Sequence, residues 1–167
     1  MGNLLHAPID DPLDALARQS LDQIAGAAAA LLDVPLVLIS ILEGPMQSYV
    51  GSHGLSKMRV GEPSPLCRDV ASSGRPIVMQ DARTRIPASA RGVWGFELVA
   101  YAGIALTLLD TSRAGAFGAL TSARRAWQSH DLQVLRCLAD AASAILNMQA
   151  ACDDNVPTGR PASPRAL

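Results

Sequence analysis

Two helix-length apolar stripes, one near each end of the chain, constrain the fold more than any other feature. In residues 13–32, apolar side chains recur at steps of three and four, with charged side chains between them. Residues 129–148 carry a second stripe of the same period. Helices of this kind are stable only when their apolar faces are covered. We therefore expect both to pack on a layer formed by the chain between them.

That intervening chain is patterned mainly as strands. The predicted order is a hairpin of two strands, a short helix, a third strand, a polar loop with a helical turn, and two further strands. Their ranges are 36–42, 47–51, 66–73, 76–80, 81–95, 96–108 and 114–121. Consecutive strands joined by short turns form antiparallel sheets. The sequence therefore predicts the α+β class, with the two terminal helices layered on one face of the sheet.

The size and charge of the chain limit its organisation and its partners. The sequence has 167 residues, of which 49% are hydrophobic and 17% charged, and its formal net charge is -1. This length fits one domain, which we place at residues 12–150, between a leader (1–11) and a disordered C-terminal tail (151–167). A chain without excess positive charge offers little to a polyanion, so nucleic acid is not expected as a partner.

Neither a membrane nor an oxidising compartment is indicated. The most apolar run, residues 98–109, is shorter than the ~20 residues that cross a bilayer as a helix, and the first residues lack the basic start of a secretory signal. Cys67, Cys137 and Cys152 are an odd number at irregular spacing, as in reduced cytosolic proteins. We therefore expect a cytoplasmic protein that makes no membrane contact.

Two blocks of sequence resemble the GAF domain family. Residues 65–83 read PLCRDVASSGRPIVMQDAR, and many bacterial members carry a similar Cys, a short helix ending in Ser-Gly, a Pro with an aliphatic strand, and then Asp-Ala-Arg. The second block consists of YAGIAL at 101–106, GAL at 118–120, RAW at 125–127 and DL at 131–132, which is similar to the closing half of the family. The resemblance extends over roughly residues 13–150.

The resemblance implies a GAF/PAS-like fold and a regulatory role. It implies a central antiparallel sheet of five or six strands, with the terminal helices on one face and a ligand pocket on the other. A domain of this kind binds a small molecule and acts in signal transduction, as in bacterial two-component systems, without catalysis of its own. Its expected partner is a histidine kinase or phosphatase. The candidate ligand-binding residues are Tyr49, Cys67, Asp81, Arg83, Trp94, Phe96 and Tyr101.

Several of these residues have a second interpretation. Cys67 is either a reactive thiolate, activated by Arg68 and the start of a short helix, or a small buried hydrophobe. Arg83 and Trp94 either hold a carboxylate or phosphate ligand or form a solvated arginine surface over a packed indole. Asp81 follows a strand, where a carboxylate commonly accepts hydrogen bonds from loop amides and fixes the turn.

No cofactor is predicted. A covalent bilin needs a Cys in the stretch before residues 96–108, and residues 83–95 contain neither Cys nor His. His6, His53 and His130 are scattered, which favours neither a haem ligand nor a zinc site. Cyclic nucleotides are also disfavoured, because the signature of the members that bind them is absent as a set.

Two alternatives to a ligand-binding sensor stay open. One is a thiol enzyme similar to the free methionine sulfoxide reductases, with Cys67 as its nucleophile. The other is a dimerisation scaffold without a pocket. Whichever of the three functions holds, we expect a parallel homodimer through the terminal helices, because Leu16, Ala27 and Leu31 lie partly off the apolar face of the first helix. The alanine run at 27–30 would allow close helix packing.

Overall fold

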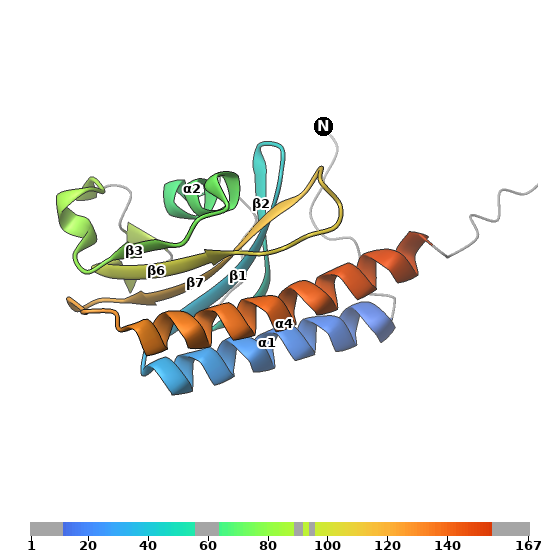
Figure 1. The fold of residues 1–167 in the computed structure, drawn as a ribbon, viewed down its shortest axis with the longest axis horizontal. Coiled ribbons are helices and arrows are strands. Elements are labelled where there is room, and N and C mark those ends of the chain that lie inside the picture. The colour runs from blue at the N-terminus through green and yellow to red at the C-terminus, as the bar shows by residue number, and fades with distance from the viewer. Residues whose placement is uncertain (1–11, 56–63, 89–91, 94–95, 155–167) are drawn as a thin grey trace, which may run out of the picture.

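A computed structural model of the chain describes residues 12–55, 64–88, 92–93 and 96–154. Five strands form one antiparallel sheet in the order β2-β1-β7-β6-β3, and a two-stranded piece pairs β4 with β5. The long helices α1 and α4 lie side by side on one face of the five-stranded sheet, and α2 lies on the other (Figure 1). The predicted α+β class is confirmed, and the antiparallel sheet, predicted to have five or six strands, has five. The elements are α1 Pro12–Leu32, β1 Leu36–Glu43, β2 Met46–His53, α2 Pro65–Ser73, β3 Ile77–Met79, η1 Ala82–Thr84, β4 Gly92–Val93, β5 Phe96–Glu97, β6 Ala100–Ala105, β7 Ala114–Thr121 and α4 Ser129–Asp154.

Strand β1 explains why the sheet is covered on both faces. Its residues alternate sides, as in any strand. Val37 and Ile39 pack with the terminal helices, whereas Leu36 and Leu38 pack with α2. A strand that is buried on both faces reads as a continuous aliphatic run. Residues 36–42 show this pattern except at Ser40.

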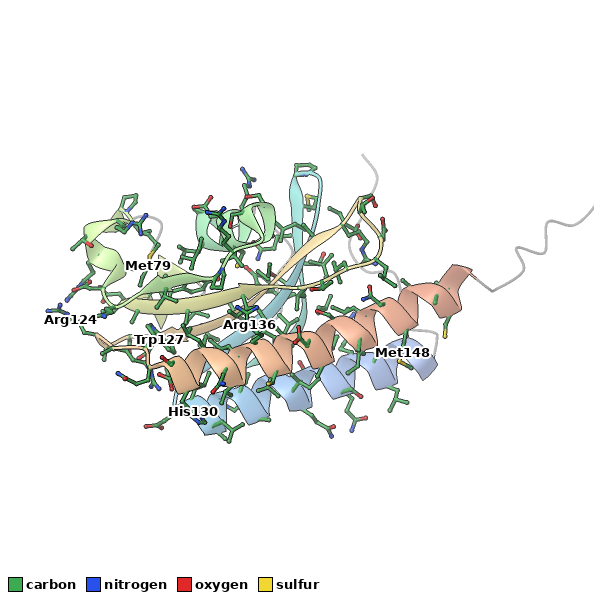
Figure 2. The ribbon with its side chains drawn as sticks, viewed as in Figure 1. Met79, Arg124, Trp127, His130, Arg136 and Met148 are labelled. Atoms are coloured by element: carbon green, nitrogen blue, oxygen red, sulfur yellow. The ribbon has the colours of Figure 1, made fainter. Side chains whose placement is uncertain are left out.

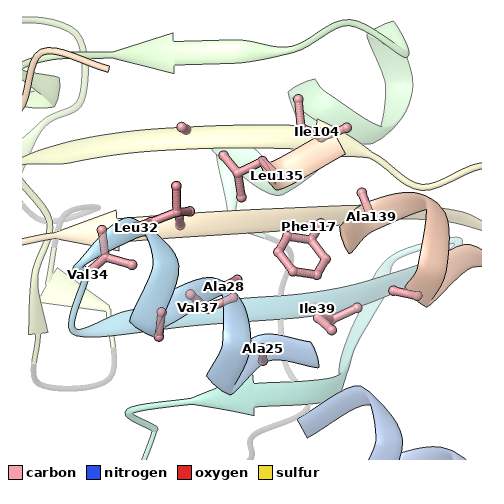
Figure 3. Close-up of a cluster of buried hydrophobic side chains, with 14 of the residues drawn as sticks. Ala25, Ala28, Leu32, Val34, Val37, Ile39, Ile104, Phe117, Leu135 and Ala139 are labelled. Atoms are coloured by element: carbon pink, nitrogen blue, oxygen red, sulfur yellow. The ribbon is translucent and has the colours of Figure 1, made fainter. Parts of the chain in front are cut away.

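The core under the terminal helices is made of small side chains facing large ones. Ala25 and Ala28 of α1 and Ala139 of α4 are completely buried, and they lie around Phe117 of β7 (Figure 3). Alanines on the inner helix face let the helix backbones approach the sheet closely, so that one aromatic ring fills the remaining space. We call this cluster, which includes Leu21, Leu32, Ile39, Ile104 and Leu135, the helix-side core.

The strand predicted over residues 96–108 is two strands. Phe96–Glu97 forms β5 with β4, and β6 begins only at Ala100. Between them the Val99 N–H still bonds to β7, where it donates to the Thr121 carbonyl at 2.9 Å, but its carbonyl accepts from the Ala82 N–H of η1. At the far end, Ser143 Oγ accepts the Thr107 N–H at 3.0 Å, which draws the chain out of the sheet.

The C-terminal helix is longer than predicted. It runs to Asp154, whereas the domain was expected to end at residue 150 and the tail to begin at 151. Residues 155–167, the expected leader 1–11 and Trp94 lie outside the described residues. Within the described part of the chain, the helices are all too short or too polar to cross a membrane.

Candidate functional site

A second interior cluster lies between the sheet and α2. Helix α2 starts with Pro65 and ends at Gly74, whose positive φ of 64° lets its N–H donate to the Val70 carbonyl at 3.1 Å. This places Leu66, Cys67 and Val70 against the sheet, all buried. We call this cluster the α2-side cluster. Its described members are Leu36, Leu38, Tyr49, Leu66, Cys67, Val70, Met79, Ala82, Ile86, Leu98, Tyr101, Ala116 and Leu120.

Polar side chains are buried in and beside this cluster. Gln47 and Tyr101 are each only 1% exposed, and Ser40 is completely buried. Tyr49 and Cys67 are buried as well. Polar groups in a protein interior are costly unless they are hydrogen-bonded. Their hydrogen bonds therefore decide what this interior can do.

The amide oxygen of Gln47 accepts a hydrogen bond, whereas its amide nitrogen has no partner among the described residues. The backbone N–H of Ser64, the residue that precedes α2, donates to Gln47 Oε1 at 2.7 Å. This bond fixes which way round the amide lies, because only the oxygen can accept. Gln47 Nε2 then points into the interior, and within the described part of the chain it has no hydrogen-bond partner.

Tyr101 lies flat on two glycines. Gly103 and Gly118 face one another across β6 and β7. A Cβ on Gly103 would overlap the Tyr101 hydroxyl, and one on Gly118 would meet the ring at 3.0 Å. The tyrosine ring can therefore pack here only because Gly103 and Gly118 have no side chains. Its hydroxyl, buried above the sheet, has no hydrogen-bond partner among the residues that the structure describes.

The Cys67 thiol lies beside these groups and is not activated. Burial raises its pKa, and this effect exceeds the lowering by the polar groups of Gln47, Ser40, Ser64 and Tyr101 that face it. Burial also raises the pKa of Tyr101 and of Tyr49. All three side chains are therefore neutral at physiological pH. A thiol held in this form is a poor nucleophile.

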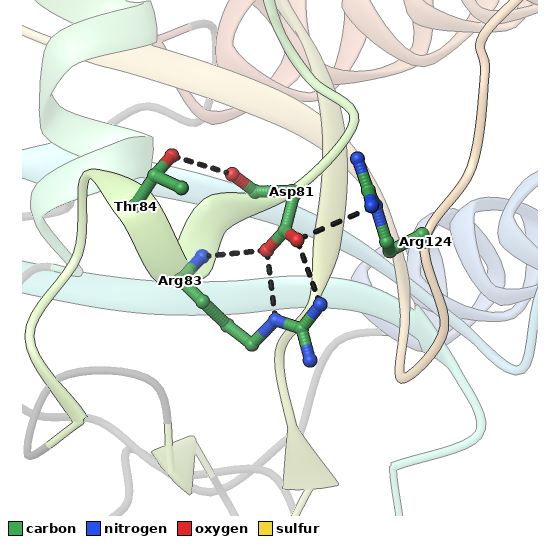
Figure 4. Close-up of polar contacts among 4 residues, drawn as sticks. All are labelled: Asp81, Arg83, Thr84 and Arg124. Carbon is green, nitrogen blue, oxygen red and sulfur yellow. Dashed lines mark hydrogen bonds and ion pairs between the residues drawn. The ribbon is translucent and has the colours of Figure 1, made fainter.

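Asp81 and Arg83 form a separate group at the surface (Figure 4). Asp81 caps η1 by accepting the Arg83 N–H at 3.0 Å, and its carboxylate also accepts from the Arg83 guanidinium at 2.9 and 2.7 Å. Arg124 approaches the same carboxylate at 3.4 Å. Hydrogen bonds from Arg83 hold the pKa of Asp81 far below its usual range. The structure supports the turn-fixing interpretation of Asp81, with Arg83 engaged in the same contact.

The predicted site residues thus separate into groups. Tyr49, Cys67 and Tyr101 lie together in the α2-side cluster, whereas Asp81 and Arg83 pair at the surface. Trp94 and the side chain of Phe96 lie outside the described residues.

Sequence reasoning missed Ser40 and Gln47. A signal for each was present: Ser40 interrupts an aliphatic run, and Gln47 is two residues from Tyr49 on one strand, so both side chains point to the same face. The described residues contain no cluster of His, Cys, Asp and Glu that could hold a metal ion.

A polar link joins the strand next to this cluster to the terminal helices. Trp127 precedes α4, and its indole Nε1–H donates to the Met79 carbonyl of β3 at 3.2 Å (Figure 2). The Arg125 guanidinium lies 4.8 Å from the Trp127 ring centroid and 3.4 Å from Asp131 Oδ1 at the start of α4. It also donates to the Asp33 carbonyl after α1 at 3.4 Å. These contacts connect β3 with the start of α4 and with the end of α1.

Comparison with known proteins identifies the family. The family model for the GAF domain matches residues 17–146. No curated protein sequence matches the chain significantly. The chain belongs to the GAF domain family, and the predicted resemblance is confirmed.

Solved structures support the same fold. The GAF domain from an Acinetobacter phosphoenolpyruvate-protein phosphotransferase is 15% identical, with a TM-score of 0.70, over 81% of this chain and 84% of that chain. The Thermosynechococcus elongatus PixJ GAF domain in its blue-light-absorbing form is 16% identical, with a TM-score of 0.69, over 87% and 94%. A type II free methionine-R-sulfoxide reductase from Thermoplasma acidophilum is 12% identical, with a TM-score of 0.63, over 81% and 96%. At these identities the likeness shows the fold alone.

Proposed function

We propose that this chain is a small-molecule-binding regulatory domain that has no catalytic activity of its own. The observation that carries the proposal is the group of buried polar side chains between α2 and the sheet, two of which have unused hydrogen-bonding atoms. Folding alone gains nothing from a buried donor without a partner. A bound molecule would use it. Tyr49, Cys67 and Tyr101 remain ligand-binding residues in this proposal, and Ser40 and Gln47 join them.

The proposed signal passes from the cluster to the helix pair. Met79 contributes its side chain to the α2-side cluster and its carbonyl to the Trp127 indole. A ligand that shifts β3 would therefore shift the start of α4. The receiving partner in this proposal is a histidine kinase or phosphatase in the cytoplasm, the context that family membership favours.

A homodimer through the terminal helices is part of the same proposal. Leu16 and Leu31 of α1 are 58% and 63% exposed, and Met148 of α4 is 69% exposed. Shallow apolar grooves lie beside them, one lined by Leu16, Ile145 and Met148, the other by Leu31, Val134 and Leu138. Exposed apolar surface of this kind commonly marks an interface. Ala28, by contrast, is completely buried in the helix-side core.

Sedimentation equilibrium at micromolar concentration tests the dimer. Leu16→Glu and Leu31→Glu should yield monomers, because each would bury a charge in the contact. Leu109→Glu is the matched control, since Leu109 is 78% exposed in the turn between β6 and β7. A monomeric wild type, or a dimer that both changes leave intact, would remove the helices from the proposal.

Ligand binding itself is tested with a metabolite thermal-shift screen, followed by methyl NMR of each hit. Hits should move the methyl signals of Leu66 and Val70 in the α2-side cluster. The methyl signals of Leu21 and Leu135, on the other side of the sheet, serve as internal controls. A ligand at about 100 times its dissociation constant adds ~2.7 kcal/mol to the stability. Hits that move only the control methyls would contradict the proposal.

The thiol-enzyme alternative is weakened by the positions of the cysteines. Cys137 and Cys152 are exposed on α4, and the sheet separates that helix from Cys67. Cys67 itself is a neutral buried thiol. We expect no reduction of free methionine sulfoxide by the purified protein with a dithiol reductant. Turnover that Cys67→Ser abolishes would establish the enzyme instead.

A further inference from the structure

Two unused hydrogen-bond donors define the chemistry of the α2-side cluster. The Gln47 amide oxygen is occupied by the Ser64 N–H, so the free end of this side chain is the NH₂ group, which can only donate. The Tyr101 hydroxyl is the second group without a partner in the described chain. Each residue is 1% exposed, so water does not replace the missing bonds at the surface.

Both donors lie beside the Cys67 thiol. They come from β2 and β6, which are not neighbours in the sheet, yet the polar ends of both side chains adjoin the Cys67 thiol on α2. Neither makes a hydrogen bond of acceptable geometry to that sulfur. Ser40 also faces the thiol, and its hydroxyl is directed to the Ala116 carbonyl at 3.4 Å. One small group placed beside Cys67 could therefore meet both donors.

Charged side chains are absent from the described part of this interior. Among the described residues the buried polar or charged side chains are Ser40, Gln47, Asp131 and Ser143, and the charged one, Asp131, lies on α4 at the other face of the sheet. On α2, Arg68 and Asp69 are exposed, and Arg83 and Arg124 are engaged with Asp81 at the surface. An ion placed here would lose its hydration without gaining a counter-charge, which is strongly unfavourable.

We infer that the ligand of the α2-side cluster is an uncharged molecule that presents a hydrogen-bond acceptor, such as a carbonyl oxygen or an unprotonated ring nitrogen, to Gln47 Nε2 and Tyr101 Oη. The inference rests on the proposed function and narrows it to one chemical class. Among the residues that the structure describes, this cluster has no buried cation for a phosphorylated or carboxylate ligand and no buried anion for an ammonium ligand, so the inference places all three outside the class.

Four probe molecules of similar size distinguish neutral, anionic, cationic and apolar ligands. Acetophenone carries a neutral acceptor, benzoate a negative charge, benzylamine a positive charge, and ethylbenzene no polar group. Each is titrated at pH 7 into the full chain, labelled so that the Gln47 side-chain amide and the Leu66 and Val70 methyl groups are observed by NMR. We expect acetophenone to bind and to move the Gln47 amide protons downfield. Ethylbenzene should bind several-fold more weakly, and the two ions should not bind.

Variants test the two donors separately. Tyr101→Phe and Gln47→Leu should each weaken acetophenone three- to tenfold, as expected for one lost hydrogen bond, and leave ethylbenzene unchanged. Gln23→Leu, on the exposed surface of α1, is the matched control and should change neither. Because Gln47→Leu also removes the acceptor of the Ser64 N–H, Tyr101→Phe is the variant that keeps the test valid if the other fails to fold.

The outcomes distinguish this inference from the function on which it rests. If ethylbenzene binds as tightly as acetophenone, or if either ion binds more tightly, and the Leu66 and Val70 methyls move, then a binding site exists and the chemical class is wrong. If none of the four probes moves these methyls, both the class and the proposed function are overturned.

Discussion

The two faces of the sheet are built differently. The buried hydroxyl on the helix side is fully used: Ser143 Oγ donates to the Ala139 carbonyl at 2.7 Å and accepts the Thr107 N–H at 3.0 Å. On the α2 side, Gln47 Nε2 and Tyr101 Oη are buried just as deeply and have no partner in the described chain. In the described chain the helix side thus uses its buried hydroxyl for stability, whereas the α2 side has buried hydrogen-bonding atoms that folding leaves unused.

The largest expected effect is on the helix side. Phe117→Ala should lower the free energy of unfolding by about 4 kcal/mol, because the ring is completely buried among alanines that cannot fill the space. Urea unfolding followed by circular dichroism measures this loss. A probe that binds the wild type should still bind the folded fraction of this variant, since Phe117 belongs to the helix-side core and not to the α2-side cluster. A loss below about 1 kcal/mol would mean that this core is not the main source of stability.

On the α2 side, the packing of Tyr101 on Gly103 can be tested directly. Gly103→Ala should destabilise the fold by about 3 kcal/mol, because the new Cβ overlaps the tyrosine hydroxyl. In a Tyr101→Leu background, the same change should cost less than about 1 kcal/mol. The double-mutant cycle, again by urea unfolding, gives the coupling. Equal costs in the two backgrounds would show that the ring does not rest on Gly103.

Loss of the hydrogen bond from Trp127 to Met79, which links the two faces of the sheet, should have an intermediate effect on the free energy of unfolding. Trp127→Phe removes the donor to the Met79 carbonyl and the ring edge that carries it, so we expect a loss of about 2 kcal/mol. Arg125→Lys, which keeps the charge beside Asp131, should cost less. Thermal and urea unfolding compare the two variants. If Arg125→Lys costs more than Trp127→Phe, the guanidinium and not the indole holds the layers together.

A smaller, pH-dependent effect is expected from Asp81 at the surface. Its pKa is depressed in the folded state by hydrogen bonds from Arg83, so its contribution is present above the unfolded pKa of about 3.9 and is lost as the pH falls below that value. The stability difference between wild type and Asp81→Asn should therefore be constant from pH 5 to 7 and shrink toward pH 2. A difference that grows on acidification would contradict the ion-pair geometry.

The secondary structure could largely be predicted because its signals are local. The period of the terminal helices, the aliphatic run of β1 and the Gly74 helix end each depend on neighbouring residues. The break before β6 could not be predicted, because it depends on a distant partner: the Val99 carbonyl accepts from the Ala82 N–H outside the sheet. An unbroken apolar run carries no sign of such a break.

The site was only partly predictable for the same reason. Tyr49, Cys67 and Tyr101 were identified through the family resemblance, and the structure brings them together. Gln47 was missed although its spacing from Tyr49 places both side chains on one face, because the hydrogen bond that accounts for its burial comes from the distant Ser64 N–H, just before α2. The place of Tyr101 depends on the register that sets Gly103 opposite Gly118, which no local pattern reveals.

The comparison between the faces is tested most directly by deleting one hydroxyl from each and measuring the free energy of unfolding without ligand. Ser143→Ala should cost about 1 kcal/mol, because it leaves the Thr107 N–H without its acceptor. Tyr101→Phe should leave stability unchanged or raise it by up to about 1 kcal/mol, because the hydroxyl it removes is buried and has no hydrogen-bond partner among the described residues. A loss of more than about 1 kcal/mol in Tyr101→Phe would show that folding already uses this hydroxyl and would contradict the account.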